Sequence, residues 1–342
     1  MRATRKHTMV WCRLMAVTAA LVVTAGCTAE ASSRAGAMSP KARNYLTEAL
    51  DIMERNSLLS AEVDWTAVRR EAFDRAGTAR TPAETYGAVR QALRDLEDQH
   101  SQFMDPDQTR KTLSASAEED VVPPEGRMLA HDIGYLALPP VPSDEAADDY
   151  VRQARAAVSK NDRQGACGWV IDLRSNWGGT MWGPLAAVGP ILGDGNTGAF
   201  VEADGEKTVW TVKNGTPQQY LHDWGPAKPL SRPMPPVAVL TSRTTRSAAE
   251  AVTIAFRGRP DTRSFGEPTS GAPTANVYHR LSDGAAIFLT QAREADRTGH
   301  VYDGPVTPDR EIHDDARDLS SHGDQVLTAA TRWLSSRPDC RQ

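Results

Sequence analysis

A hydroxyl-rich turn in front of an apolar helix is the first stretch whose residue types suit chemistry. Residues 244–250 read Thr-Thr-Arg-Ser-Ala-Ala-Glu and follow the apolar run 237–241. A serine hydroxyl attacks well only when a neighbouring base takes its proton and N–H groups stabilise the oxyanion that forms. A strand-to-helix turn projects Ser247 away from the sheet, and the unpaired amides of the first helical turn, beginning with Ala248, point to the same place. Ser247 is therefore our candidate nucleophile and Ala248 a candidate oxyanion donor.

A second turn of the same kind ends the apolar strand predicted at residues 168–173. It reads Asp-Leu-Arg-Ser-Asn-Trp-Gly-Gly over residues 172–179. Gly178 and Gly179 have no side chains, so a substrate carbonyl can approach their backbone and an amide can turn outward. A lone serine at a helix start is more often a cap, and a glycine pair is often only a loop. Two such turns at the carboxyl edge of one predicted parallel sheet favour a site.

Two charged residues in these stretches have alternative interpretations. Glu250 falls one turn into the nucleophile helix, where it could orient a catalytic partner or simply face solvent. Arg174 follows a buried strand, where it could hold a substrate carboxylate or form a structural ion pair. Sequence alone leaves both alternatives open.

The first 27 residues predict a bacterial lipoprotein signal. Basic residues lead into an apolar run at residues 15–25, which is shorter than the roughly 20 residues that a spanning helix needs. The run ends in Val-Thr-Ala-Gly-Cys, a lipobox-like sequence that makes Cys27 the expected lipidated residue. A freely secreted protein cut near the same place is the alternative. We expect an exported protein on the extracytoplasmic face of the cell membrane.

Composition limits the partners and cofactors. Loss of the four basic residues in the signal takes the formal charge from −5 to about −9, so nucleic acid is not an expected partner. Cys167 and Cys340 are left for an oxidising compartment, but sequence does not show whether they meet. The spacing of cysteines and histidines supports no structural zinc site, and we expect no metal or cofactor.

The pattern of apolar residues divides the mature chain into a tether at 28–40, a helical region at 41–110 and an α/β core at 128–342. A polar stretch at 111–127 reads as a linker or mobile loop. In the core, strands and helices alternate, which indicates a mainly parallel sheet covered by helices. We expect strands at 133–138, 168–173, 237–241 and 263–265, helices at 144–158, 181–191, 247–257 and 323–335, and hairpins at 198–212 and 276–292.

The chain resembles the carboxyl-terminal processing, or tail-specific, family of serine peptidases over roughly residues 95–315. The stretches 96–103, 133–136, 172–179 and 245–250 carry the resemblance, and Gly-Glu-Pro-Thr-Ser-Gly at 266–271 and Thr-Pro-Asp at 307–309 complete it. The resemblance implies a crotonase- and Clp-like spiral α/β core, preceded here by an N-terminal helical bundle. It also implies a protein or peptide substrate.

Two departures from the best-known branch decide which residue could serve Ser247. About 30 residues separate His100 from Ile133, too few for the PDZ domain of that branch. That branch places a lysine base where this chain has Ala272, and no lysine follows Lys228. The chain instead resembles the branch of nisin-resistance protein and tricorn-type proteases, in which a histidine of the first motif serves the serine. The resemblance implies His100 as the base.

Alternatives to His100 and to catalysis remain. His279 is the second candidate base, and His131 and His222 are weaker ones. Asp98 or Ser101 could fix the tautomer of His100, a role that sequence cannot assign. A base with the reference pKa of about 6.5 predicts that acylation falls on acidification through roughly pH 6 to 7. The expected function is a lipid-anchored serine peptidase with a Ser-His dyad. The alternative is a catalytically decayed peptide- or ligand-binding lipoprotein of the same fold.

Overall fold

The computed structural model describes residues 36–114, 121–218, 222–313 and 323–341. The predicted signal, Cys27 and most of the predicted tether lie outside these residues. Residues 37–342 form one compact unit. Within the described part of the chain, no helix has the length and apolar character needed to cross a membrane.

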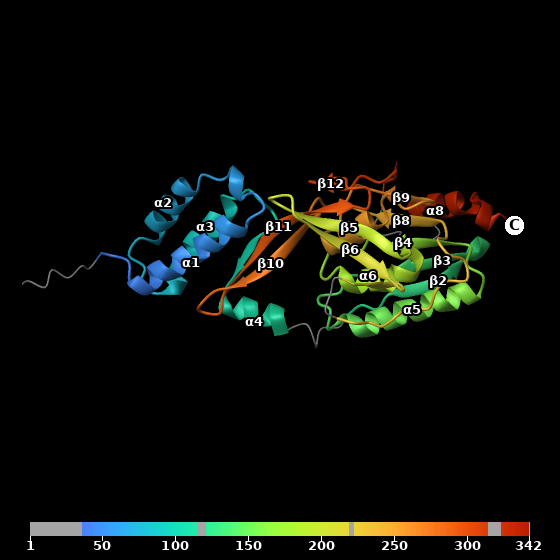
Figure 1. The fold of residues 1–342 in the computed structure, drawn as a ribbon, viewed down its shortest axis with the longest axis horizontal. Coiled ribbons are helices and arrows are strands. Elements are labelled where there is room, and N and C mark those ends of the chain that lie inside the picture. The colour runs from blue at the N-terminus through green and yellow to red at the C-terminus, as the bar shows by residue number, and fades with distance from the viewer. Residues whose placement is uncertain (1–35, 115–120, 219–221, 314–322, 342) are drawn as a thin grey trace, which may run out of the picture. The chain divides into compact units, whose positions relative to one another are not determined.

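A six-stranded sheet carries both of the turns that the sequence singles out (Figure 1). Its strand order is β13-β9-β8-β4-β3-β2, and every neighbouring pair is parallel except β2 with β3. The strands are β2 (Glu125–Leu129), β3 (Ile133–Ala137), β4 (Gly168–Asp172), β8 (Val237–Thr241), β9 (Thr262–Gly266) and β13 (Arg310–Glu311). Because β4 and β8 are adjacent and parallel, the turns that follow them leave the sheet at the same edge.

Helices cover both faces of this sheet. Side chains of a strand alternate between the two faces, so Ile171 and Val239 enter one core cluster while Val170 and Ala238 enter the other. The first cluster is completed by α5 (Ala147–Arg163), α6 (Trp182–Leu192) and α7 (Ala248–Ala255), and the second by α8 (Gln325–Ser335). Burial on both faces explains why β4 and β8 read as continuous apolar runs.

An antiparallel sheet built around β11 lies beside the first (Figure 1). The long strand β11 pairs with β1, β5, β10 and β12, and β6 and β7 extend the sheet beyond β5. The strands are β1 (Gln102–Met104), β5 (Gly195–Glu202), β6 (Lys207–Lys213), β7 (Thr216–Pro217), β10 (Thr274–Arg280), β11 (Ala286–Asp296) and β12 (Val301–Tyr302). Pairing of β1 with β11 brings the segment that contains His100 to this sheet.

Three N-terminal helices pack on one end of the β10–β11 hairpin. They are α1 (Pro40–Asn56), α2 (Trp65–Ala76) and α3 (Tyr86–Arg94), and they share a core with Phe103, Ile287 and Leu289. Asp64 caps α2 by accepting a hydrogen bond from the Ala67 amide at 3.0 Å. The mixed α/β class and the N-terminal helices agree with the sequence-based prediction.

The predicted linker at residues 111–127 is wrong at both ends. Residues 111–114 close the helix α4 (Pro106–Ser114), and residues 125–127 begin strand β2. Strand β2 is an edge strand whose side chains stay partly exposed, so its sequence lacks the apolar run that marks the central strands. The boundaries proposed for the tether, the helical region and the core stay a prediction.

Cys167 and Cys340 form a disulfide, which the sequence left undecided. Their Cα atoms lie 5.1 Å apart across a sequence separation of 173 residues. The bond attaches the C-terminal end of the described chain to the residue that precedes β4.

Candidate active site

Ser247 stands at the N-cap of α7 in a backbone conformation that side chains rarely adopt. Its φ is 53° and its ψ is −116°, in the positive-φ region that costs a residue with a Cβ free energy. Such strain persists only where surrounding contacts hold it, and it is frequent at functional sites. Here the Ser247 amide donates to Glu250 Oε2 at 2.7 Å, and the Arg246 amide donates to the Asn176 carbonyl at 3.1 Å.

Hydroxyl groups join the turn after β8 to the turn after β4. Ser242 Oγ donates to the Arg174 carbonyl at 2.7 Å, and Thr245 Oγ1 donates to the Leu173 carbonyl at 3.0 Å. The hydroxyl-rich composition of residues 241–247 therefore supplies donors to the carbonyls of the two residues that follow β4. The structure brings Ser247 and the glycine pair together through these bonds.

Gly178 and Gly179 both need the conformational freedom of glycine. Their φ angles are 129° and 102°. A Cβ added to Gly178 would lie 3.4 Å from Ser247 Cβ, and one added to Gly179 would lie 2.0 Å from the Val141 carbonyl oxygen. Gly178 therefore lies directly against the candidate nucleophile.

The amides near Ser247 are not equally available to an oxyanion. The Gly178 amide donates to Asn176 Oδ1 at 3.0 Å, and Asn176 Nδ2 donates to the Leu138 carbonyl at 3.0 Å. Among the described residues, the amides of Gly179 and Ala248 have no hydrogen-bond acceptor. Asn176, which the sequence analysis did not single out, fixes the shape of this turn.

Glu250 is a buried anchor of the site and does not face solvent. Its side chain is 0% exposed and accepts four hydrogen bonds. Oε2 accepts the amides of Ser247 and Ala272, at 2.7 and 2.9 Å, and Oε1 accepts the Thr269 hydroxyl and the Gly271 amide, at 2.5 and 2.9 Å. Burial raises the pKa of Glu250 above its ordinary value, and the four donors oppose that rise. The position that holds lysine in the related branch thus supplies an amide to Glu250 in this chain.

The imidazole of His100 makes its hydrogen bond with a residue far along the chain. Nδ1 lies 2.7 Å from Oγ1 of Thr274, the first residue of β10, and the ring meets Phe288 edge-on with centroids 6.3 Å apart. Burial, reinforced by the positive charge of Arg246 and opposed by Asp98, lowers the pKa of His100 to about 4. No hydrogen bond joins His100 to the Ser247 hydroxyl within the described chain.

Asp98 and Ser101 hold the backbone around His100 and leave its ring alone. Asp98 Oδ1 accepts the amides of His100 and Ser101 at 2.8 and 2.7 Å and the Thr290 hydroxyl at 3.0 Å. The Ser101 hydroxyl donates to Asp98 Oδ2 and accepts the Thr290 amide at 2.9 Å. These bonds fasten the segment of His100 to β11.

The other candidate bases lie in different surroundings. His279, on β10, contacts Gln291 Nε2 through its own Nε2 at 2.6 Å. His131 precedes β3, at the edge of the parallel sheet opposite to the one where Ser247 lies. His222 Nε2 contacts Asp148 at 2.6 Å.

Arg174 has the geometry of a structural ion pair. It is 2% exposed, and its guanidinium contacts Asp172 Oδ2 and Asp324 Oδ2, each at 2.7 Å. Asp324 is also the N-cap of α8, where it accepts the Leu327 amide at 2.8 Å. The arginine therefore ties the end of β4 to α8.

Comparison with known proteins identifies the family. Residues 132–312 match the model of peptidase family S41, which is more than half of the chain. The chain belongs to peptidase family S41. This confirms the predicted membership, which rested on the two sheet-edge turns and the motifs around them.

Two relatives place this S41 chain more closely. It is 24% identical to the nisin-resistance protein of Lactococcus lactis subsp. lactis over 304 residues, which cover 87% of this chain and 88% of that protein. It is 24% identical to the carboxy-terminal processing protease CtpA of Bacillus subtilis over 184 residues, but these cover only 35% of that protein.

Solved structures support the fold. A lipoprotein from Streptococcus agalactiae superposes with a TM-score of 0.72 at 26% identity, covering 88% of this chain and 98% of that one. A photosystem II D1 C-terminal processing protease superposes with a TM-score of 0.62 at 16% identity, covering 80% and 93%. The predicted fold class is therefore confirmed as that of S41 proteases.

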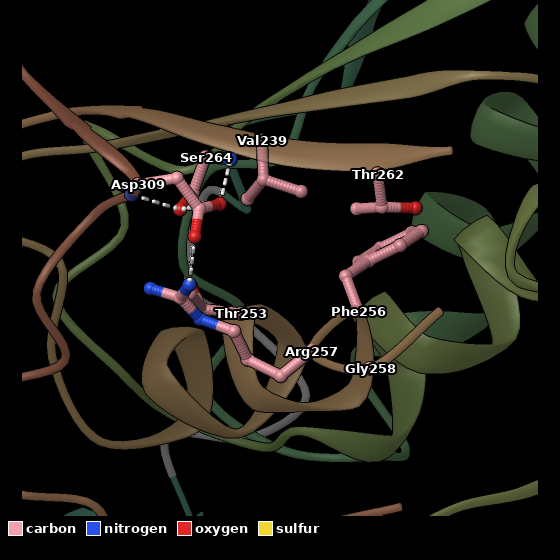
Figure 2. Close-up of a pocket in the computed structure, with 8 residues that line it drawn as sticks. All are labelled: Val239, Thr253, Phe256, Arg257, Gly258, Thr262, Ser264 and Asp309. Atoms are coloured by element: carbon pink, nitrogen blue, oxygen red, sulfur yellow. Dashed lines mark hydrogen bonds and ion pairs between the residues drawn. The ribbon is translucent and has the colours of Figure 1, made fainter. Parts of the chain in front are cut away.

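A small pocket of the S41 core lies away from Ser247, at the other end of α7 (Figure 2). An ion pair crosses it, with Arg257 Nη1 2.9 Å from Asp309 Oδ1, and Asp309 Oδ2 accepts the amide and hydroxyl of Ser264 at 2.7 and 2.9 Å. Burial alone would raise the pKa of Asp309, but the Ser264 amide and the charge of Arg257 lower it overall. The Thr-Pro-Asp motif thus fastens residues 307–309 to β9.

Side chains suited to a metal ion gather at one exposed place in the described chain. Glu202, Asp204 and Glu206, at the turn between β5 and β6, have carboxylate oxygens within 4.8 Å of one another. Exposed acidic clusters are common without an ion, so these residues carry no functional assignment. The expectation that the protein uses no metal or cofactor stays a prediction.

Proposed function

We propose that this protein is a serine peptidase that hydrolyses peptide bonds with Ser247 as nucleophile and His100 as general base. The observation that carries the proposal is the strained conformation of Ser247, held by Glu250 and set against Gly178. A hydroxyl on a strained, half-buried serine beside a glycine-rich turn is the arrangement that acyl transfer needs. Membership of a peptidase family supports protein or peptide substrates.

The proposed reaction uses four groups of this chain. His100 takes the proton of Ser247 Oγ as the oxygen attacks the peptide carbonyl, and it returns that proton to the leaving amine. The amides of Gly179 and Ala248 hold the oxyanion, because neither has another acceptor in the described structure while the Gly178 amide is engaged by Asn176. Water, activated by the same histidine, then releases the acyl group from Ser247.

The hydrogen bond between His100 and Ser247 would form when substrate binds. Catalytic hydrogen bonds are often long in the absence of substrate and tighten in the Michaelis complex. Glu250 holds the amides of Ser247 and Ala272, and Thr274, which is bonded to Ala272, contacts His100. One hydrogen-bond network therefore holds both residues, which supports the proposal that they meet in the substrate complex.

Labelling with a fluorophosphonate tests the proposal against the alternative of a decayed binding lipoprotein. We expect the wild type to label at Ser247, and both Ser247→Ala and His100→Ala to lose nearly all labelling while remaining folded. His279→Ala is the matched histidine control and should label normally. Absence of labelling in a folded wild-type protein would favour the binding function instead.

We also propose that lipid on Cys27 holds the protein on the extracytoplasmic face of the membrane. The lipobox-like sequence carries this proposal, and the similar lipoprotein from Streptococcus agalactiae supports it. Acyl chains supply about 0.8 kcal/mol of membrane binding per buried methylene. Cys27→Ser should move the protein from the membrane pellet to the supernatant, and retention after a high-salt wash would contradict lipid anchoring.

A further inference from the structure

The imidazole of His100 has one hydrogen-bond partner among the described residues, and that partner carries no charge. Nδ1 lies 2.7 Å from Thr274 Oγ1. Asp98 is the carboxylate nearest in sequence. Its oxygens accept hydrogen bonds from the amides of His100 and Ser101 and from the hydroxyls of Ser101 and Thr290. The place that a carboxylate holds in a Ser-His-Asp triad is therefore taken by a hydroxyl.

The direction of this hydrogen bond follows from the task proposed for the ring. A base that accepts the Ser247 proton through Nε2 must carry its own proton on Nδ1. A threonine oxygen has lone pairs that accept a hydrogen bond, so the ring would donate through Nδ1–H to Thr274. This bond fixes the tautomer and the rotation of the imidazole at the same time.

Thr274 is itself held by the network that shapes the nucleophile. Its amide donates to the Ala272 carbonyl at 2.8 Å, and the Ala272 amide donates to Glu250 Oε2. The same oxygen of Glu250 accepts the Ser247 amide. Three hydrogen bonds, through Ala272 and Glu250, thus connect the residue whose hydroxyl orients the base with the backbone of the nucleophile.

We propose that Thr274 is the positioning residue of a Ser247–His100–Thr274 triad, with its hydroxyl holding His100 in the Nδ1–H tautomer. This inference rests on the proposed function, which sets the tautomer expected of the ring, while the contact between Thr274 and His100 is independent of it. A neutral hydroxyl orients the ring as a carboxylate does, but it stabilises the imidazolium less, because it offers a dipole where a carboxylate offers a full charge. Burial and the positive charge of Arg246 also disfavour the imidazolium, so the ring is neutral in the free protein.

The experiment compares Thr274→Val, which removes the hydroxyl at nearly constant volume, with Thr274→Ser, which keeps it. Thr197→Val is the matched control, because Thr197 lies in a strand of the same sheet and its buried hydroxyl has one partner among the described residues, the Trp210 carbonyl at 3.1 Å. Nitrogen-15 spectra of the full chain report the tautomer of His100, identified by the signal that His100→Gln removes. Fluorophosphonate inactivation separates the first-order inactivation constant from the binding constant of the probe.

The wild type, Thr274→Ser and Thr197→Val should show the Nδ1–H tautomer, and Thr274→Val should lose it. The inactivation constant should fall roughly 10- to 100-fold in Thr274→Val with unchanged probe binding, and serine should restore most of it. Where valine lowers the unfolding midpoint more than the Thr197 control does, Thr274→Ala replaces it. Retention of the tautomer and rate without the hydroxyl, or failure of a folded Thr274→Ser to restore them, would overturn the inference.

The two proposals fail in different ways. If the folded wild type does not react with the fluorophosphonate at all, the peptidase function fails, and the tautomer spectra still decide the role of Thr274. If the wild type reacts and Thr274→Val is indistinguishable from it in both measurements, only the triad is wrong.

Discussion

At the scale of single residues, the environment of His100 changes what its identity alone predicts. An exposed histidine would titrate near pH 6.5, whereas burial together with Arg246 lowers the pKa of His100 to about 4. A base with that pKa stays neutral, and ready to accept a proton, through the whole neutral range. The structure therefore moves the expected acid limit of acylation from pH 6 to 7 down to about pH 4.

This shift gives a prediction for the pH profile. The rate of fluorophosphonate inactivation should be flat from about pH 8 to pH 5 and fall to half near pH 4. Arg246→Gln should move the midpoint upward, because the positive charge that disfavours imidazolium is gone. Arg243→Gln, whose side chain is 80% exposed on the same loop, is the control and should leave the profile unchanged. A wild-type midpoint between pH 6 and 7 would show that burial does not act on the ring.

The same pKa makes a contribution to stability with a defined sign. Because the folded pKa is lower than the unfolded one, the unfolded chain binds this proton more readily between about pH 4 and pH 6.5. Stability from His100 is therefore fully present above about pH 6.5 and is lost as the pH falls from there toward 4. His100→Gln should flatten this part of the stability profile.

At the scale of elements, the turn after β4 depends on a close approach that only glycine permits. In Gly179→Ala the new Cβ would meet the Val141 carbonyl oxygen at 2.0 Å, in addition to the strain of a φ of 102°. We expect loss of fluorophosphonate labelling and a lower unfolding midpoint. Gly195→Ala separates the two causes, because Gly195 has a φ of 121° with open space around it. If both variants lower the unfolding midpoint equally, backbone strain and not the Val141 contact accounts for the lost stability of Gly179→Ala.

Most elements of the core could be predicted because their signals are local. Strand β8 spans the predicted residues 237–241, since a strand buried on both faces must be continuously apolar. Helix α2 begins at Trp65 behind its Asp64 cap, inside the predicted helical region at 41–110. Strand β2 was missed because an exposed edge strand has no such pattern. The joining of two predicted hairpins and β1 into one sheet depends on contacts between distant segments, which periodicity does not report.

The residues of the candidate site also differ in whether local sequence or distant contacts reveal them. Ser247, the glycine pair and His100 stand in recognisable motifs, so the sequence was enough to single them out. Thr274 is 174 residues from His100 and carries no motif of its own, and only the pairing of β10 with β11 brings it to the ring. The alternatives for Glu250 and Arg174 were open because burial and partners decide between them.

At the scale of the whole molecule, the disulfide closes a long loop. Cys167 and Cys340 are 173 residues apart, and a cross-link of that span lowers the entropy of the unfolded chain by up to about 5 kcal/mol at 25 °C in the chain-entropy treatment. Cys340→Ser should lower the free energy of unfolding by a measurable part of that amount. A reducing agent should destabilise the wild type and leave Cys340→Ser unaffected. Equal stability of the oxidised and reduced wild type would show that the packing of α8 alone holds the C-terminal segment in place.

The position of Thr274 in the chain also bears on when the protein becomes active. A chain is synthesised from its amino end, so His100 is made well before Ser247, and the hydroxyl that orients it is made later still. On the proposed mechanism, the new chain stays inactive until β10 pairs with β11, because only then is the base aligned. The delay before activity then follows from the order of these residues along the chain. In refolding, fluorophosphonate reactivity should appear only with the last recovery of native structure, and earlier reactivity would contradict this view.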